Sequence, residues 1–288
     1  MNRASIVLKL LAPMAAKFEE STKDPSLAQK NILFDYIARN KDTEYGKKYG
    51  FSNIKSVEEY RKAVPVCNYL DIASCAERMA SGEKNILTAD APVFFGRTSG
   101  TTGKPKLIPV TEYSRSKKAE LMALWTYYIS RDHPDITDGK IFAIIDPETK
   151  TFSPSGLPCG PENGHAYINL PYIIKSVCAI PYEAFEIEDY NARYYSILRM
   201  AMGYNITTLA TLNPSAIIIL CEKVKEWQGR IIHDIEKGTL DKSLNIRADI
   251  REILEKKLKP DPRRANELRK ILEEKKELLP NSSGPKWR

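Results

Sequence analysis

The sequence predicts an α/β fold, in which N-terminal helices precede a mostly parallel sheet flanked by helices. Two observations lead to this prediction. Apolar residues recur at helical spacing through the first 65 residues, and from Ile86 onward short apolar runs alternate with longer helical patterns. Strands and helices that alternate in this way are typical of a largely parallel sheet covered by helices. With 288 residues, of which 42% are hydrophobic and 28% charged, the chain can bury a sizeable core.

Residues 1–85 are expected to form a mainly helical cover. The first helix has one apolar face, formed by Ile6, Leu10, Leu11 and Met14. A second helix starts at Asp24-Pro25, because proline is favoured at the first helical position. The patterns predict two further short helices, over 57–63 and 71–79.

Residues 86–240 are expected to form the α/β core. The predicted strands and helices are, in chain order, the strands 92–96, 106–110, 140–146 and 205–212, and the helices 112–130, 186–202 and 214–228. Thr111 and Asn213 each stand where an N-cap would lie, the latter before Pro214. The intervening segment 147–185, which is rich in Pro, Gly and Ser, reads as a long excursion.

Residues 245–279 are expected to form charged helices. One apolar stripe consists of Ile250, Ile253, Leu254 and Leu258, and a second of Leu268, Ile271, Leu272 and Leu278. A solvated charged face over a buried apolar stripe is the favoured interpretation, and a partner-binding surface is the alternative.

One short segment carries most of the chemistry. The run Thr98-Ser-Gly-Thr-Thr-Gly-Lys-Pro-Lys-Leu107 places hydroxyls, glycines and lysines between two predicted strands. Glycine permits close approach of the backbone, while hydroxyls, amides and ammonium groups bind anionic oxygens. The run matches neither the Walker pattern nor G-x-G-x-x-G, yet its composition suits a polyphosphate. A Ser/Thr/Gly-rich hairpin that binds nothing is the alternative.

The order of residues in this run resembles the phosphate loop of the acyl-adenylate-forming enzymes. Its flanks narrow the resemblance to the auxin-responsive-promoter (Gretchen Hagen) family of acyl acid amido synthetases. The flanking segments that carry this likeness are 42–51, 64–66, 80–83, 108–111 and 210–215. The resemblance extends from about residue 10 to the end of the chain.

The resemblance implies ATP-dependent adenylation of a carboxylic acid. The carboxylate attacks the α-phosphate of ATP, pyrophosphate leaves, and an amine or amino acid then displaces AMP. Because the first step brings two anions together, its catalysis depends on positioning and charge stabilisation. The residues that the resemblance assigns to the phosphates of ATP are Thr98, Ser99, Gly100, Thr101, Thr102, Gly103, Lys104 and Lys106.

The acid is expected at the carboxyl ends of the parallel strands, where open α/β sheets bind ligands. This places Thr211, Leu212 and Asn213 beside it, with Leu124 and Tyr128 of the helix 112–130 in its wall. Plain core packing is the alternative for any one of these side chains.

Members of the family are considerably longer and carry further motifs and a small C-terminal domain. We therefore expect residues 1–288 to be the N-terminal portion of an adenylate-forming domain, incomplete as a catalyst, with the Mg²⁺ ligands elsewhere. Apolar surface exposed by the missing part is expected to favour self-association. A ligase that passes the acyl group to coenzyme A, and a non-catalytic remnant or interaction module, are the alternatives.

Composition excludes several other classes. The formal charge of +7 is compatible with ATP and carboxylate substrates, and no nucleic-acid-binding motif accompanies it. No apolar run is long enough to span a membrane. Five widely spaced cysteines and three dispersed histidines predict neither a disulfide framework nor a metal site. A cytoplasmic location is expected.

Overall fold

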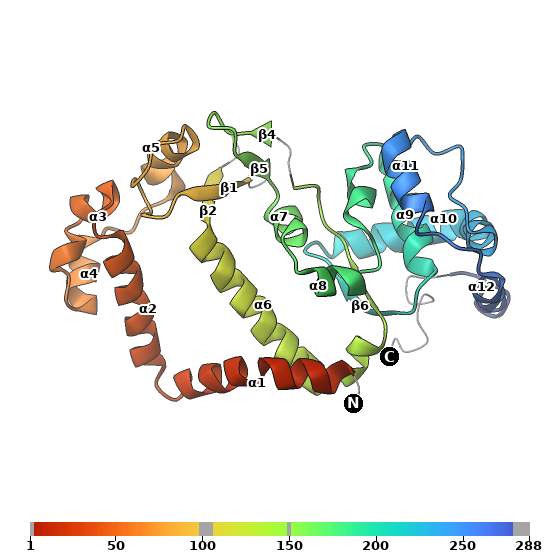
Figure 1. The fold of residues 1–288 in the computed structure, drawn as a ribbon, viewed down its shortest axis with the longest axis horizontal. Helices are drawn as coiled ribbons and strands as arrows, with labels where there is room; N and C mark the ends of the chain where they lie inside the picture. The colour runs from red at the N-terminus through yellow and green to blue at the C-terminus, as the bar shows by residue number, and fades with distance from the viewer. Residues whose placement is uncertain (1–2, 98–105, 149–150, 279–288) are drawn as a thin grey trace. The chain divides into compact units, whose positions relative to one another are not determined.

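The computed structural model describes residues 3–97, 106–148 and 151–278 (Figure 1). The chain divides into two compact units. Unit 1 comprises residues 1–132 and 148–165, and unit 2 comprises residues 133–147 and 166–288. Each unit contains its own small sheet and its own helices.

Helices form the first part of unit 1. They are α1 (Arg3–Ser21), α2 (Pro25–Asn40), α3 (Glu44–Lys48), the 3₁₀ helix η1 (Phe51–Asn53), α4 (Val57–Ala63) and α5 (Tyr69–Ala80). The predicted start at Asp24-Pro25 is confirmed, since the Asp24 carboxylate accepts a hydrogen bond from the Leu27 N–H at 2.9 Å. Asn68 and Asp71 form a capping box at the start of α5.

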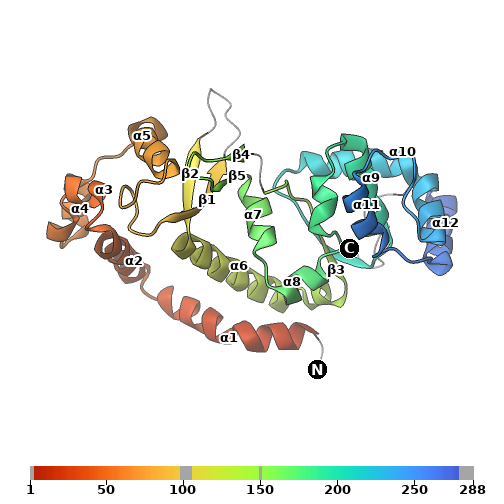
Figure 2. The same ribbon diagram turned by 45° about the horizontal axis from the view of Figure 1, so that its top comes forward.

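Helix α1 packs against α6 (Glu112–Asp132), which meets it at an angle in Figure 1. Figure 2 shows the same two helices from another side. The ring of Phe18 packs edge-on against Tyr128, with 6.3 Å between the ring centroids. The Tyr128 hydroxyl donates a hydrogen bond to Glu19 at 3.1 Å. The predicted N-cap of α6 is also present, because Thr111 Oγ1 accepts from the Ser114 N–H at 3.2 Å.

The sheet of unit 1 has the strand order β2-β1-β5-β4. Its strands are β1 (Pro92–Arg97), β2 (Leu107–Thr111), β4 (Thr151–Phe152) and β5 (Pro158–Gly160). β1 pairs antiparallel with β2 and parallel with β5, and β4 pairs antiparallel with β5. Phe95 of the central strand is fully buried, in a small core that includes Met79 and Ile86.

Unit 2 contains a parallel pair of strands, β3 (Lys140–Ala143) and β6 (Ile206–Ala210). Its helical elements are η2 (Pro134–Asp138), α8 (Tyr172–Val177), η3 (Tyr182–Glu186), α9 (Tyr190–Met202), α10 (Ser215–Lys237), α11 (Ala248–Glu255) and α12 (Pro262–Lys275). Helix α7 (Glu162–Ile168) begins in unit 1 and ends in unit 2. The excursion 147–185 therefore holds short strands and helices.

The predicted α/β class is confirmed, with helices before and around the strands. The pairing differs from a mostly parallel sheet, because the described strands lie in two sheets and two of the four pairings between them are antiparallel. The reason is chain length. Only residues 98–106 separate β1 from β2, whereas a crossover between parallel strands needs about a dozen residues or more.

The core of unit 2 surrounds α9, of which Tyr195 and Leu198 are fully buried. A polar network crosses this core. Asp234 of α10 accepts hydrogen bonds from the Tyr195 hydroxyl and the Thr239 hydroxyl, both at 2.7 Å, and from the Asp241 N–H at 2.9 Å. The buried guanidinium of Arg199 donates to the Asp234 carbonyl at 2.8 Å. Burial lowers the pKa of Arg199. The carbonyl oxygens of Asp234 and Thr239 accept hydrogen bonds from its guanidinium and offset the cost of burying the charge.

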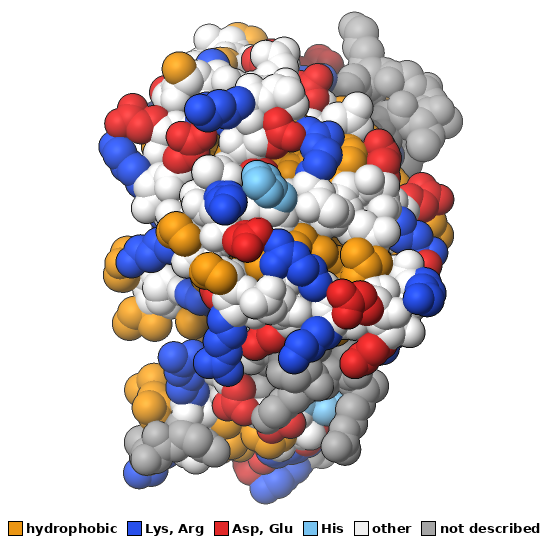
Figure 3. Space-filling model, turned by 90° about the vertical axis from the view of Figure 1, so that its right-hand side faces the viewer, with side chains coloured by type: hydrophobic (Ala, Val, Ile, Leu, Met, Phe, Trp, Pro, Cys, Tyr) orange, Lys and Arg blue, Asp and Glu red, His pale blue; other side chains and the backbone are white. Residues whose placement is uncertain are grey.

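Helices α11 and α12 present apolar stripes to this core. Leu254 and Leu268 are fully buried, and the other predicted stripe residues except the half-buried Ile253 belong to the same core or pack against it. Their outer faces carry ion pairs such as Lys256 with Glu252 at 2.7 Å. The face of unit 2 in Figure 3 intermingles Lys and Arg with Asp and Glu. The solvated charged face is therefore the interpretation that fits these helices.

We predict that Asp234→Ala destabilises unit 2 by about 3–5 kcal/mol, because the buried Tyr195 hydroxyl and two part-buried donors lose their acceptor and the buried Arg199 loses the nearby carboxylate charge. Urea unfolding followed by circular dichroism measures this change. Asp249→Ala is the matched control, since Asp249 pairs with Arg247 where both side chains are more than 60% exposed. It should cost less than about 1 kcal/mol. Equal losses in the two variants would contradict a structural role for the Asp234 network.

Candidate active site

The predicted phosphate loop joins β1 to β2, as the sequence indicates. Seven of its assigned residues, Thr98, Ser99, Gly100, Thr101, Thr102, Gly103 and Lys104, lie outside the described residues. The structure describes the residues at the two ends of the loop, Arg97 and Lys106, which we call its feet. Arg97 is the last residue of β1, and Lys106 immediately precedes β2 with its side chain exposed. A cation therefore stands at each foot.

Tyr69, the first residue of α5, holds the second foot of the loop, where β2 begins. Its hydroxyl accepts a hydrogen bond from the Leu107 N–H at 2.8 Å and lies 3.4 Å from the Leu107 carbonyl oxygen. The Lys106 ammonium lies 5.5 Å from the centroid of the Tyr69 ring, within the range of a cation–π contact. One side chain thus fixes both the backbone and the cation where β2 begins.

A hollow of about 780 Å³ adjoins these feet within unit 1. Its lining comes from α5, from the ends of β1 and β2, and from the β4–β5 hairpin, and includes Tyr69, Leu70, Glu77, Arg97, Lys106, Thr151 and Phe152. The Arg97 guanidinium donates a hydrogen bond to Thr151 Oγ1 at 2.8 Å. This neutral hydroxyl fixes the position of the guanidinium without cancelling its charge. The hollow combines two cations with apolar walls, a composition that suits an anionic ligand with an apolar body.

A buried pair of side chains, His165 and Glu148, packs against Phe94 of β1. His165 Nδ1 and Glu148 Oε1 are 2.5 Å apart, and the imidazole stacks on Phe94 with 4.1 Å between ring centroids. The pair ties α7 to the strand that leads into the loop. Sequence reasoning found no such role for His165, because Glu148 is far from it in the chain and no periodic pattern links them.

Of the residues assigned to the acid, two lie in unit 1 and three in unit 2. Leu124 and Tyr128 of α6 are half-buried in unit 1. Burial and the hydrogen bond to Glu19 raise the pKa of Tyr128, so its phenol is neutral at pH 7. Its contacts with Phe18 and Glu19 give this side chain a packing role. Whether either side chain binds an acid stays a prediction.

Thr211, Leu212 and Asn213 follow β6 in unit 2. Thr211 Oγ1 accepts from the Asn213 N–H at 3.2 Å, and Leu212 is 82% exposed. Helix α10 begins at Ser215 with Pro214 in the N-cap position, so the predicted N-cap at Asn213 is wrong by one residue. Asn213 instead closes a local turn, because its Oδ1 accepts from the Ser215 N–H at 3.1 Å.

The described residues contain no group of three or more His, Cys, Asp or Glu side chains placed to hold a metal ion. All five cysteines are free thiols, and Cys67 is exposed. Within the same residues, no helix is both long and apolar enough to cross a membrane. Exposed apolar side chains gather on α8, at Tyr172, Ile173 and Ile174. Self-association through such surface stays a prediction.

The sequence also matches a known domain. A model of the GH3 family N-terminal domain matches residues 14–285, nearly the whole chain. The chain belongs to the GH3 family. The resemblance drawn from the loop and its flanks is thereby confirmed.

Curated GH3 relatives of the chain include plant amido synthetases. The probable indole-3-acetic acid-amido synthetase GH3.1 of Arabidopsis thaliana is 29% identical over 258 residues, which cover 85% of this chain and 43% of that protein. The jasmonoyl–L-amino acid synthetase GH3.5 of Oryza sativa subsp. japonica is 24% identical over 263 residues, 88% of this chain and 45% of that protein. The chain spans less than half the length of these GH3 relatives.

Solved GH3 structures share the fold. The GH3.15 acyl acid amido synthetase superposes with a TM-score of 0.75 at 20% identity, over 96% of this chain and 48% of that one. The same enzyme in complex with 2,4-DB gives a TM-score of 0.73, also at 20% identity, over 94% of this chain and 46% of that one. At this level of identity the likeness concerns the fold alone.

We predict that Tyr69→Phe loosens the second foot of the GH3 loop, because the Leu107 N–H loses its acceptor. Hydrogen exchange of the Leu107 amide should accelerate about ten-fold or more, while the global stability changes little. Tyr172→Phe is a matched control, since Tyr172 is 84% exposed on α8. If Leu107 exchanged at the same rate in both variants, Tyr69 would not hold the strand.

Proposed function

We propose that the protein containing this chain is an ATP-dependent acyl acid amido synthetase. It activates a small carboxylic acid as the acyl-adenylate and transfers the acyl group to an amine or amino acid. The single observation that carries this proposal is the Thr98–Lys106 segment, which connects β1 and β2 in a family of amido synthetases and has Arg97 and Lys106 at its feet.

The charge at the feet suits the first chemical step. An acid carboxylate and ATP repel each other, so the site must supply positive charge and hydrogen-bond donors where negative charge gathers. Arg97 is held by Thr151 Oγ1, and Lys106 lies over the Tyr69 ring. Both partners are neutral, so both positive charges remain available to the phosphates. The loop hydroxyls and amides would supply the remaining donors.

The amine acceptor is favoured over coenzyme A by the relatives. Those reported above are named as synthetases that join an acid to an amino acid or form an amide. Adenylation also uses Mg²⁺, which neutralises phosphate charge. We place its ligands outside residues 1–288, as the family resemblance implies, and we place the protein in the cytoplasm.

The two steps can be tested separately in the full-length protein. ATP–pyrophosphate exchange in the presence of candidate acids measures adenylation, and mass spectrometry of the products with amino acids or coenzyme A identifies the acceptor. We expect exchange that depends on an acid and an amide product. A thioester product without amide would replace the proposal with a coenzyme A ligase, and a lack of exchange with every acid would favour a non-catalytic protein.

In the full-length enzyme, we predict that Ser99→Ala, Thr101→Ala and Lys106→Ala each slow adenylation by about ten- to a hundred-fold, because each removes a contact to a charged phosphate. Amine attack on a supplied acyl-adenylate should change little, since pyrophosphate has already left. Lys117→Ala is the control for charge, because Lys117 pairs with Glu120 on the exposed face of α6. Equal losses in both steps would mean that the loop is structural.

A further inference from the structure

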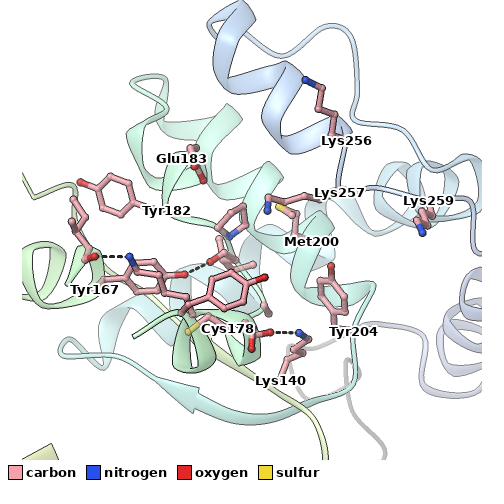
Figure 4. Close-up of a pocket in the computed structure, with 17 residues that line it drawn as sticks. Lys140, Tyr167, Cys178, Tyr182, Glu183, Met200, Tyr204, Lys256, Lys257 and Lys259 are labelled. Atoms are coloured by element: carbon pink, nitrogen blue, oxygen red, sulfur yellow. Dashed lines mark hydrogen bonds between the residues drawn. The ribbon is translucent and has the colours of Figure 1, made fainter. Parts of the chain in front are cut away.

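Unit 2 contains a second hollow, of about 660 Å³, that the proposed amide synthesis does not use (Figure 4). Its volume lies within the range of small-molecule sites. Five lysines and a single acidic residue, Glu183, line it. The lysines come from β3, α8 and the segment that follows α11, and are Lys140, Lys175, Lys256, Lys257 and Lys259. Such an excess of one charge favours an anionic ligand.

Two of these lysines are held by neutral backbone groups. The Lys140 ammonium donates to the Ser176 carbonyl oxygen at 2.5 Å, and the Lys175 ammonium donates to the Ile168 carbonyl oxygen at the same distance. A carbonyl fixes the position of an ammonium group without cancelling its charge. Because an ammonium group has three donors, each lysine keeps donors for a ligand. The arrangement therefore holds positive charge in place before any ligand arrives.

The neighbouring residues Lys256 and Lys257 differ in the direction of their side chains. Lys256 forms an ion pair with Glu252 at 2.7 Å and extends away from the hollow in Figure 4. Lys257 extends toward Met200. The charge of Lys256 is compensated outside the hollow, whereas that of Lys257 is directed into it.

Aromatic rings also line the hollow. Tyr167 and Tyr182 stack with 6.1 Å between centroids and an angle of 26° between the rings. The Lys140 ammonium lies 5.7 Å from the centroid of Tyr204. Burial raises the pKa of both the Tyr167 phenol and the Cys178 thiol, so neither adds negative charge at pH 7. A flat ring that carries an anionic group would match both surfaces.

We propose that this hollow binds a small phosphate-bearing molecule with a flat aromatic ring, of the nucleoside monophosphate class. A phosphate group carries close to two negative charges at pH 7, and Lys140, Lys175 and Lys257 meet these charges with several donors. The tyrosine wall contacts the ring. No described residue of the phosphate loop lines this hollow. A test of this site therefore does not depend on whether the proposed synthetase activity is correct.

The test uses AMP as the probe and the full chain as the protein. Calorimetry at low salt gives the affinity, and hydrogen exchange of residues 166–183 reports whether AMP occupies this hollow. We expect protection of this segment in the wild type and in Lys106→Ala, which alters only the loop. Loss of the protection in Lys106→Ala, or its absence in the wild type, would overturn the proposal.

Three variants test the chemistry of the site. Lys257→Gln should weaken AMP binding about ten-fold, because one contact to a charged group is lost, and Lys257→Arg should restore most of it. Lys140→Gln combined with Lys257→Gln should weaken binding further. Lys256→Gln is the matched control and should change the affinity less than two-fold. Equal effects of Lys256→Gln and Lys257→Gln would mean diffuse attraction to a basic surface, and would overturn the assigned site.

Inorganic phosphate distinguishes the two surfaces of the hollow. If the tyrosine wall contributes, phosphate alone should bind at least about ten-fold more weakly than AMP, since base–aromatic stacking then stabilises AMP only. Equal affinities would remove the aromatic part of the proposal. Tyr204→Leu provides an independent measure, because it should weaken AMP while leaving phosphate binding close to that of the wild type.

Discussion

Strand β1 is the element on which unit 1 depends. It pairs with β2 on one edge and β5 on the other, and buries both Phe94 and Phe95 completely. On one side Phe94 stacks on His165, which is bound to Glu148, and on the other Phe95 belongs to the core with Met79 of α5. A loop that must bind a charged substrate needs fixed ends. Burial of β1 fixes the first end, and Tyr69 fixes the second.

Much of this arrangement could be predicted from the sequence, because its signals are local. Helix caps at Asp24 and Thr111 follow from residue type and position, and the strands on either side of the loop follow from apolar runs bounded by turn residues. The loop itself was recognisable from residue order. The apolar stripes over residues 245–279 predicted most of the side chains that face the core, Ile253 being the exception.

The rest depends on contacts between distant residues. The antiparallel pairing of β1 with β2, the bond from Tyr69 to Leu107 and the contact of His165 with Glu148 leave no periodic pattern in the chain. Helices α7 and α8 were missed because they are short and lie among Pro and Gly residues, where helix formation depends on tertiary packing. Helix α10 extends past the predicted end to Gly238, whose φ of 70° favours glycine and terminates it.

The net positive charge of the chain is distributed in two ways. On α11 and α12 most basic side chains pair with acidic neighbours one turn away, and these pairs contribute little to stability or binding. In the two hollows, by contrast, Arg97, Lys106, Lys140 and Lys175 lie against neutral partners, namely Thr151, the Tyr69 ring, the carbonyl oxygens of Ile168 and Ser176, and the Tyr204 ring. A neutral partner positions a cation while leaving its field intact. The partner of each cation, rather than the number of cations, therefore separates a binding surface from a solvated one.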